Sequence, residues 1–222
     1  MVRVIPVPFR VAPEGSYLND IRLTPDGRHA FISESGLGSI IILDVHQGTM
    51  RRTFDKSLAA RGRADRTPVI DGQPWIDQST GDPLVVHCDG IAVSPDGVWV
   101  HFQAISNDRH YRVPVENMLS GGIPNTQTQR LGRAPVTDGI IFDDAGNLYF
   151  SALEENAVIY TNPEGEWVTL AQSPDLKWPD SFAIHRPTNT LYFTTAQIHL
   201  TPPFAIDGTL PEDPYRLWAA PL

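Results

Sequence analysis

Short apolar segments recur along the chain, each followed by a tight turn and a second apolar segment. Each run is only strand length and is rich in Val, Ile, Phe and Tyr, which is typical of β-strands. Most of the turns contain Pro-Asp-Gly or Asp-Ala-Gly, which suit a reversal between antiparallel strands. The pattern therefore predicts a β-hairpin at the start of each repeat. The four segments are IRLTPDGRHAFISES, GIAVSPDGVWVHFQAI, GIIFDDAGNLYFSAL and SFAIHRPTNTLYFTTAQ.

An acidic residue stands at the start of each repeat, and further strand-like segments follow each hairpin. The acids are Asp20, Asp89, Asp138 and Asp180. They recur about 40 to 70 residues apart, as four-stranded propeller blades do. The 20 prolines and 17 glycines disfavour long helices. We therefore expect an all-β fold, a single β-propeller domain over residues 1–222. Its four four-stranded blades are placed at residues 17–54, 89–131, 138–171 and 180–222.

The sequence leaves the closure of the propeller undecided. The last repeat ends before a fourth strand, and the strand-like residues 2–9 have no blade of their own. Pairing residues 2–9 beside the final strand would remove two exposed sheet edges and close a four-bladed ring. The alternative is an open set of four blades, part of a propeller of the six-bladed type.

The interval between the first and second repeats contains an insertion at residues 55–87. Two segments within it, 68–75 and 82–87, are predicted to be hairpin arms around the polar tip Ile76–Gly81. We expect the insertion to lie over one face of the disc, either as a lid or as a surface loop without a role in function.

Composition excludes several classes of function. The net charge is −9, from 17 Lys and Arg against 26 Asp and Glu, so nucleic acid is a poor partner. The only cysteine, Cys88, forms neither an intramolecular disulfide nor a thiolate zinc cluster. No stretch approaches a membrane span, and MVRVIPVPFR lacks the apolar run of a signal peptide. We expect a soluble protein without membrane contact, and its compartment stays unassigned.

The repeated acids are the first candidates for chemistry. If each precedes the innermost strand of a blade, the four carboxylates gather at one mouth of the central channel. Such oxygen ligands, with a carbonyl oxygen from Asn19, suit Ca²⁺ or another hard divalent cation. The proposed metal ligands are Asn19, Asp20, Asp89, Asp138 and Asp180. The alternative is that each Asp accepts backbone hydrogen bonds and holds a turn in a duplicated sheet unit.

A second set of polar residues lies one strand further along each repeat. Glu34 and Glu154 are candidate general bases, and His199 is a candidate acid–base group. Gln103 and Gln197 are candidate ligand-binding groups, and Trp178 is a candidate aromatic wall over the channel. For each of the polar residues, the alternative is an ordinary loop residue.

Several longer motifs carry a family resemblance, in order from about Tyr17 to the end of the chain. They are YLNDIR (17–22), HCDGIAVSPDG (87–97), YRVPVENML (111–119), TDGIIFDDAGNLYFSALEENAV (137–158), LKWPDSFAI (176–184) and QIHLTPPF with PYRLWAAPL near the C-terminus. Together they resemble the major royal jelly protein/yellow family, in particular its bacterial members.

That resemblance implies a six-bladed propeller, distantly similar to gluconolactonases and senescence-marker-type lactonases. The lactonase-like propellers hold a divalent ion in a ring of Asp, Asn and Glu, and yellow-related proteins include binders of small aromatic amines. Many family members are secreted. This chain departs from the family in lacking about two N-terminal blades. It also reads Glu34-Ser35-Gly36 where several bacterial members have Asp-Ser-Gly.

Three functions are consistent with these features. The first is a propeller that binds a small molecule at the mouth of its central channel. The second is a metal-assisted enzyme, either a lactonase-like hydrolase or an isomerase, so the sequence leaves catalysis undecided. The third is an assembly module whose open blade edges recruit another copy of the chain.

Overall fold

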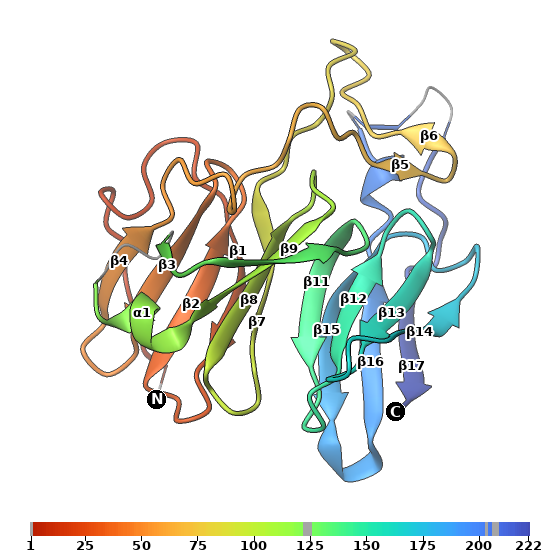
Figure 1. Ribbon diagram of the computed structural model, residues 1–222. Helices are drawn as coiled ribbons and strands as arrows, with labels where there is room; N and C mark the ends of the chain where they lie inside the picture. The colour runs from red at the N-terminus through yellow and green to blue at the C-terminus, as the bar shows by residue number, and fades with distance from the viewer. Residues whose placement is uncertain (1, 122–125, 203, 206–208) are drawn as a thin grey trace.

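The computed structural model describes residues 2–121, 126–202, 204–205 and 209–222, and strands dominate its secondary structure (Figure 1). The first sheet has the order β1 (Leu18–Leu23), β2 (His29–Glu34), β3 (Ser39–Asp44), β4 (Thr49–Thr53). The second has the order β7 (Cys88–Val93), β8 (Trp99–Ala104), β9 (Arg109–Pro114), β10 (Gln129–Arg133). The third has the order β11 (Thr137–Phe142), β12 (Leu148–Ala152), β13 (Ala157–Thr161), β14 (Trp167–Gln172). The fourth has three strands, β15 (Pro179–His185), β16 (Thr190–Thr195) and β17 (Leu217–Pro221).

The remaining elements are short. They are the hairpin β5 (Val69–Ile70) and β6 (Gln73–Pro74), the helix α1 (Val115–Leu119), and two 3₁₀ turns, η2 (Arg186–Thr188) and η3 (Ile198–Leu200). In the described part of the chain, no helix has the length and apolar character needed to cross a membrane. The four larger sheets are the blades of a β-propeller, which confirms the predicted all-β fold.

The first strand of each blade has a β-bulge at its acidic residue. Pairing with the second strand is interrupted between Leu18 and Ile21, Cys88 and Ile91, Thr137 and Ile140, and Pro179 and Phe182. The acid lies within each interruption. A bulge places an extra residue against the partner strand and changes the direction in which its side chain points. The same irregularity therefore presents a carboxyl group at the same end of every blade.

Glycines allow the inner strands to lie unusually close together. A Cβ atom on Gly90 would lie 2.5 Å from the carbonyl oxygen of Asp138. A Cβ atom on Gly139 would lie 2.1 Å from the carbonyl oxygen of Asp180. Contacts this short exclude any side chain at either position. Each Asp-Gly pair of β7 and β11 therefore supplies a carboxyl group and, through its glycine, lets the neighbouring inner strand approach closely.

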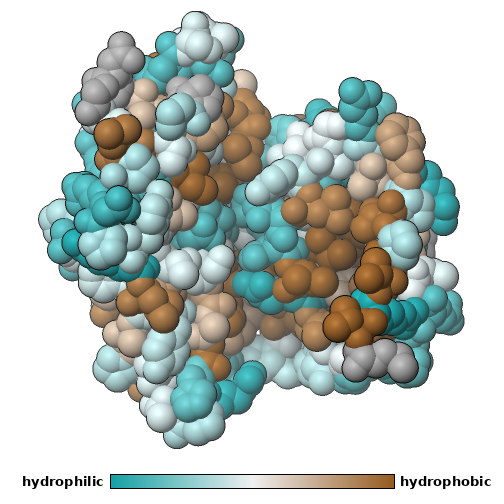
Figure 2. All heavy atoms as spheres, turned by 180° about the vertical axis from the view of Figure 1, so that it is seen from behind, coloured by the Kyte–Doolittle hydropathy of each residue, from teal (hydrophilic) through white to brown (hydrophobic). Residues whose placement is uncertain are grey.

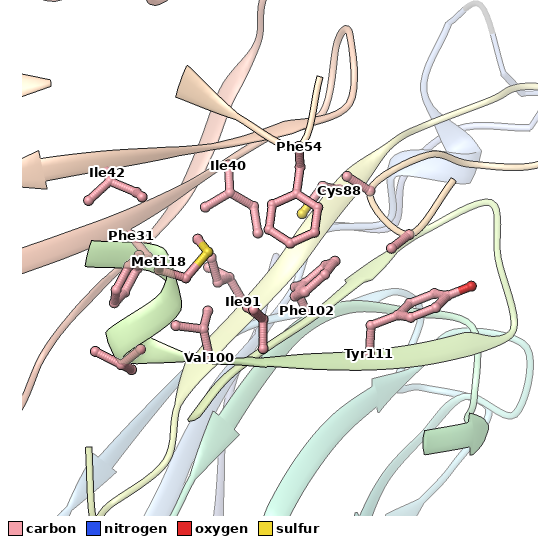
Figure 3. Packing of buried hydrophobic residues seen from close by; sticks show 14 residues of the cluster. Phe31, Ile40, Ile42, Phe54, Cys88, Ile91, Val100, Phe102, Tyr111 and Met118 are labelled. Carbon is pink, nitrogen blue, oxygen red and sulfur yellow. The ribbon is translucent and has the colours of Figure 1, made fainter. Parts of the chain in front are cut away.

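The space between the first two blades is filled with apolar side chains (Figure 3). Phe31 and Ile40 from the first blade meet Ile91 and Phe102 from the second. Helix α1 adds the fully buried Met118. Since the faces of neighbouring blades diverge toward the outside of a propeller, this helix fills the wedge that the two sheets leave.

The four blades form an open arc. Strand β1 packs beside β7, β7 beside β11, and β11 beside β15, but the described residues show no comparable packing between β1 and β15. Seen from behind, with the first blade on the right, the molecule has two lobes separated by a hollow (Figure 2). Hydrophobic side chains gather on the wall of each lobe. The two walls are where a closed ring would bring the first and last blades together.

The predicted closing strand at residues 2–9 was wrong. These residues form no strand, and the Arg3 guanidinium donates hydrogen bonds to the carbonyl oxygens of Val45 (2.7 Å) and His46 (3.1 Å) in the first blade. Pro6 and Pro8 explain the failure, because proline has no N–H. Because the two prolines are two residues apart, both would face the same edge of a strand, and that edge would lack two N–H donors. The fourth blade accordingly keeps three strands.

The insertion lies over the third and fourth blades (Figure 1). Its local structure differs from the prediction, since residues 68–75 form the hairpin β5–β6 by themselves. Asp71 and Gly72 both have positive φ angles, 51° and 76°, which is typical of a type I′ turn. The two predicted arms meet near the tip, where the backbone nitrogen of Leu84 donates to the carbonyl oxygen of Trp75 at 3.4 Å and Ile76 forms an isolated bridge with Pro83.

Candidate functional site

Three of the repeated acids border one pocket at the channel mouth. The pocket has a volume of about 370 Å³, and Asp89, Asp138 and Asp180 line it together with Asn19. Asp89 and Asp138 are almost fully buried, 3% and 7% exposed, while Asp180 is half-buried. The bulges of β7, β11 and β15 bring these carboxyl groups together although they are far apart in the sequence.

Asp89 and Asp138 form a hydrogen-bonded carboxyl pair. Burial raises the pKa of Asp89 to about 7, although hydrogen bonds with Asp138 and Ser35 act to lower it. Burial and the neighbouring carboxylates of Asp89 and Asp180 raise the pKa of Asp138 well above its usual range. Two carboxylates in a dry site cannot both ionise at low cost. The pair therefore holds a proton more readily than an exposed carboxylate does, with Asp138 as the donor and Asp89 as the acceptor of the hydrogen bond between them.

The remaining oxygens of the pair have fixed partners. Oδ2 of Asp138 accepts a hydrogen bond from the indole Nε1 of Trp178 at 2.7 Å. Oδ2 of Asp89 accepts from Nδ2 of Asn19 at 2.6 Å and from Oγ of Ser35 at 3.1 Å. These donors come from the first and fourth blades and fix the orientation of both carboxyl groups.

Asp20 lies beside the pocket and is held by Arg22. One terminal nitrogen of Arg22 donates to Oδ2 of Asp20 at 3.0 Å and to the carbonyl oxygen of Ile140 in β11 at 3.2 Å. Burial raises the pKa of Asp20 more than Arg22 lowers it, and the Asp180 carboxylate raises it further. Arg22 thus spans the channel from the first blade to the third.

An aromatic wall covers the acids. Trp178 is fully buried in the pocket wall, as is Trp75 of the insertion (4% exposed), and their rings meet edge to face at 4.9 Å. Phe204 packs on Trp75 at 5.6 Å. The insertion therefore supplies one wall of the pocket. It covers the channel mouth from a position over the third and fourth blades.

The residues as placed do not fit a bound divalent cation. Across the described ranges, no group of three or more His, Cys, Asp or Glu side chains is arranged to hold a metal ion. Asn19 directs its amide nitrogen, and not its carbonyl oxygen, at Asp89. Arg22 occupies Asp20, and the hydroxyl of Ser181 donates to Asp180.

Glu34 is a structural anchor. Its Oε1 accepts hydrogen bonds from the backbone nitrogens of Tyr17, Gly36 and Leu37 at 2.8–3.0 Å. Its Oε2 accepts from Arg52 at 2.6 Å. Burial raises the pKa of Glu34, but these hydrogen bonds outweigh it and the net shift is downward. A carboxylate with every lone pair engaged is a poor general base.

Glu154 and His199 both hold the insertion in place. Glu154 accepts hydrogen bonds from Arg66 and from the backbone nitrogen of Val69. Nε2 of His199 lies 3.0 Å from Oδ2 of Asp71, and its ring stacks on Trp178 at 6.0 Å. Burial lowers the pKa of His199 despite the nearby Asp71 carboxylate. These contacts tie the hairpin β5–β6 to the third and fourth blades.

The two glutamines position loops. The side-chain nitrogen of Gln103 donates to the carbonyl oxygens of Asn107 (3.2 Å) and Pro135 (2.7 Å). The Gln197 amide pairs with the backbone of Glu212, donating at 2.9 Å and accepting at 2.8 Å. Neither side chain borders the pocket at the channel mouth. Both side chains therefore stabilise the backbone of loops by hydrogen bonds.

Sequence patterns did not indicate Ser35, Arg22, Trp75 or Phe204 as site residues. Ser35 and Arg22 lie within the first predicted hairpin segment, so their position gave only a weak signal. Trp75 and Phe204 reach the pocket from irregular segments, and only the folded arrangement of the insertion brings them there.

Comparison with known proteins identifies the family. The sequence profile of the major royal jelly proteins matches residues 1–200. The chain belongs to the major royal jelly protein family. A curated relative is the 6-deoxy-6-sulfogluconolactonase of Pseudomonas putida, 28% identical over 134 residues, which are 58% of this chain and 44% of that protein.

Solved structures share the fold of this royal jelly family member. The calcium-binding protein regucalcin from Agrobacterium tumefaciens has a TM-score of 0.59 at 21% identity, over 86% of this chain and 57% of its own. A gluconolactonase from Xanthomonas campestris has a TM-score of 0.60 at 14% identity, over 97% and 60%. The chain spans less than half of the curated relative and about three-fifths of these structures.

Proposed function

We propose that this protein binds a small organic cation, an amine on an aromatic or apolar scaffold, in the pocket at the channel mouth. The observation that carries the proposal is the buried Asp89–Asp138 pair beneath a wall of Trp75, Trp178 and Phe204. An ammonium group gains from the carboxylates below it and from the aromatic faces beside it. The pocket volume of about 370 Å³ accommodates one aromatic ring with a short side chain.

The protonation state of the pair predicts how binding depends on pH. Since the pKa of Asp89 lies at about 7, its carboxylate becomes fully ionised only above neutrality. An ammonium ligand should therefore bind more tightly at pH 8 than at pH 6, about tenfold if one full charge is gained.

Titration calorimetry with 2-phenylethylamine tests this. The matched controls are 3-phenylpropionate, an anion of similar shape, and the neutral 3-phenyl-1-propanol. We expect binding of the amine alone, rising with pH and lost in Asp89→Asn. Equal affinity for the alcohol, or binding that survives in Asp89→Asn, would contradict the proposal.

Lactone hydrolysis is a second candidate, supported by the same pair and by the lactonase among the relatives. Asp89, with a pKa near neutrality, takes a proton from the water that attacks the lactone carbonyl. Asp138, protonated, gives its proton to the ring oxygen as the acyl–oxygen bond breaks. Release of acid from glucono-1,5-lactone in a pH-stat tests this role. A rate equal to the uncatalysed rate, or one unchanged in Asp89→Asn, would rule it out.

A further inference from the structure

A second cavity lies between the second and third blades, outside the channel. Its volume is about 680 Å³, which is within the range of small-molecule sites. The wedge between the first and second blades is closed by α1 and Met118. The corresponding wedge between the second and third blades is open to solvent. Its lining comes from strands β8, β9 and β10 on one side and from strands β11 to β14 and their turns on the other.

Aromatic side chains form the walls of this wedge. Trp99 lies on the second blade, and Phe142, Phe150 and Trp167 lie on the third. Phe150 and Trp167 pack together at 5.2 Å, yet Trp167 remains 46% exposed. A flat aromatic molecule is the ligand whose faces match walls of this kind.

Positive charge lies along the same wedge. The guanidinium of Arg112 is held 4.0 Å above the Trp99 ring, and its Nε donates to Gln129 at 2.9 Å. Within the described residues, its two terminal nitrogens make no hydrogen bond and no ion pair. Arg133, also in the lining, forms an ion pair with Asp108, with 3.5 Å between its Nε and Oδ2 of Asp108. A guanidinium with two free donors on one edge binds a carboxylate in bidentate fashion.

The acidic groups of the wedge are occupied by other partners. Arg186 holds the carboxylate of Asp144, and the Asp96 carboxylate accepts hydrogen bonds from Ser94 and the backbone of Val98. Both acids lie in hairpin turns, and the Asp96 carboxylate keeps its charge because its hydrogen-bond donors are neutral. Within the described residues, Arg112 is the arginine of the lining that has no acidic partner.

The floor contributes an unused hydrogen-bonding atom. Nδ1 of His101 lies 2.9 Å from Nε2 of His110, and both rings are buried. Nδ1 of His110 is also buried and has no partner in the described structure. Such an atom costs free energy unless it is paired, so a ligand that reaches it is favoured.

From these features we propose that the wedge between the second and third blades binds an aromatic carboxylate. Its ring packs on the half-exposed Trp167, and its carboxylate pairs with the terminal nitrogens of Arg112. This site is separate from the channel mouth in position and in charge. The two pockets select ligands of opposite sign.

Calorimetry with 2-naphthoate tests the proposal, with the neutral 2-naphthamide as the matched probe. We expect saturable binding of the acid at one site per chain and quenching of tryptophan fluorescence. Arg112→Gln should weaken binding at least tenfold, because a charge-assisted bidentate pair is lost. Arg130→Gln is the control, since Arg130 is an exposed arginine of β10 outside the cavity lining. Asp138→Asn should leave naphthoate binding unchanged.

Removal of Arg112 also removes its stacking on Trp99, so each variant is first compared with the wild type in a thermal melt. If Arg112→Gln does not fold, Leu131→Trp provides the second test. Leu131 lines the cavity and is 45% exposed, and a larger side chain there should block entry. The proposal is overturned by an absence of saturable binding, by equal affinity for the amide, or by equal loss in Arg130→Gln.

Discussion

At the scale of single residues, the buried pair of Asp89 and Asp138 makes the free energy of unfolding depend on pH. The pKa of Asp89 is about 7 in the folded chain, chiefly because of burial, and about 3.9 in the unfolded chain. The folded state therefore binds more protons between these values. This contribution to stability is fully present below pH 4 and is lost as the pH rises toward 7.

Asp89→Asn should consequently raise the free energy of unfolding at pH 8 by about 2–4 kcal/mol, with a much smaller effect at pH 4. Urea denaturation at the two pH values measures this. Asp96→Asn is a suitable control, because the pKa of that exposed turn acid is shifted in the opposite direction, downward, chiefly by its hydrogen bond from Ser94. A stability gain that did not depend on pH would show that Asp89 is already ionised in the folded protein.

The site residues show what sequence can reveal at this scale. The repeat placed Asp89, Asp138 and Asp180 at one mouth because identical bulges direct equivalent side chains alike. Repetition gave no information about the donors that face them. Asn19 and Ser35 act across a blade boundary on Asp89, and such contacts depend on packing between sheets.

At the scale of elements, the buried histidine pair of β8 and β9 changes stability with pH in the opposite direction to the acid pair. Burial lowers the pKa of His110 to about 3 and that of His101 well below its usual value, and the nearby charge of Arg112 lowers both further. The unfolded state binds protons from about pH 6.5 downward. Stability from these groups is therefore present above pH 6.5 and lost as the pH falls toward 3.

We expect His110→Gln to reduce this loss by about 1.4 kcal/mol per pH unit between pH 6 and 4. The quantity to compare is the slope of unfolding free energy against pH, from urea denaturation of variant and wild type. His46→Gln provides the control, because His46 is exposed. Equal slopes for wild type and His110→Gln would mean that His110 takes up a proton without unfolding.

Strands could be predicted where the alternation of apolar and polar side chains decides the pairing. They were harder to predict where backbone hydrogen-bond donors or turn geometry decide it. The apolar pattern located the hairpins β1–β2, β7–β8, β11–β12 and β15–β16. Residues 2–9 have the same apolar character, but Pro6 and Pro8 remove the donors that an edge strand needs. In the insertion, the preference of Asp71 and Gly72 for positive φ angles outweighed the longer hairpin that hydrophobicity suggested.

At the scale of the whole molecule, the insertion braces the arc. It leaves the first blade and is fixed to the third by Glu154 with Arg66, and to the fourth by Asp71 with His199. Trp75 completes the brace by packing on Trp178 and Phe204. These contacts join parts of the chain that the packing of inner strands alone does not connect.

Trp75→Ala should therefore destabilise the protein by about 3–5 kcal/mol, the usual cost of deleting a buried Trp side chain, and expose the insertion to proteases. Trp167→Ala, which removes a half-exposed ring, should cost about 1 kcal/mol. Thermal melts and limited proteolysis measure the two effects. Equal losses in both variants would mean that the insertion contributes no more than a surface loop.

The open side of the arc also has a mechanical consequence. Asp20 and Asp180 lie on the two rims, β1 and β15, and the charge of one raises the pKa of the other. Their repulsion favours separation of the two rims, and the ion pair of Asp20 with Arg22 opposes it. A positive charge bound between the rims would add to that opposition. We therefore expect the channel mouth to become narrower when a cationic ligand binds there.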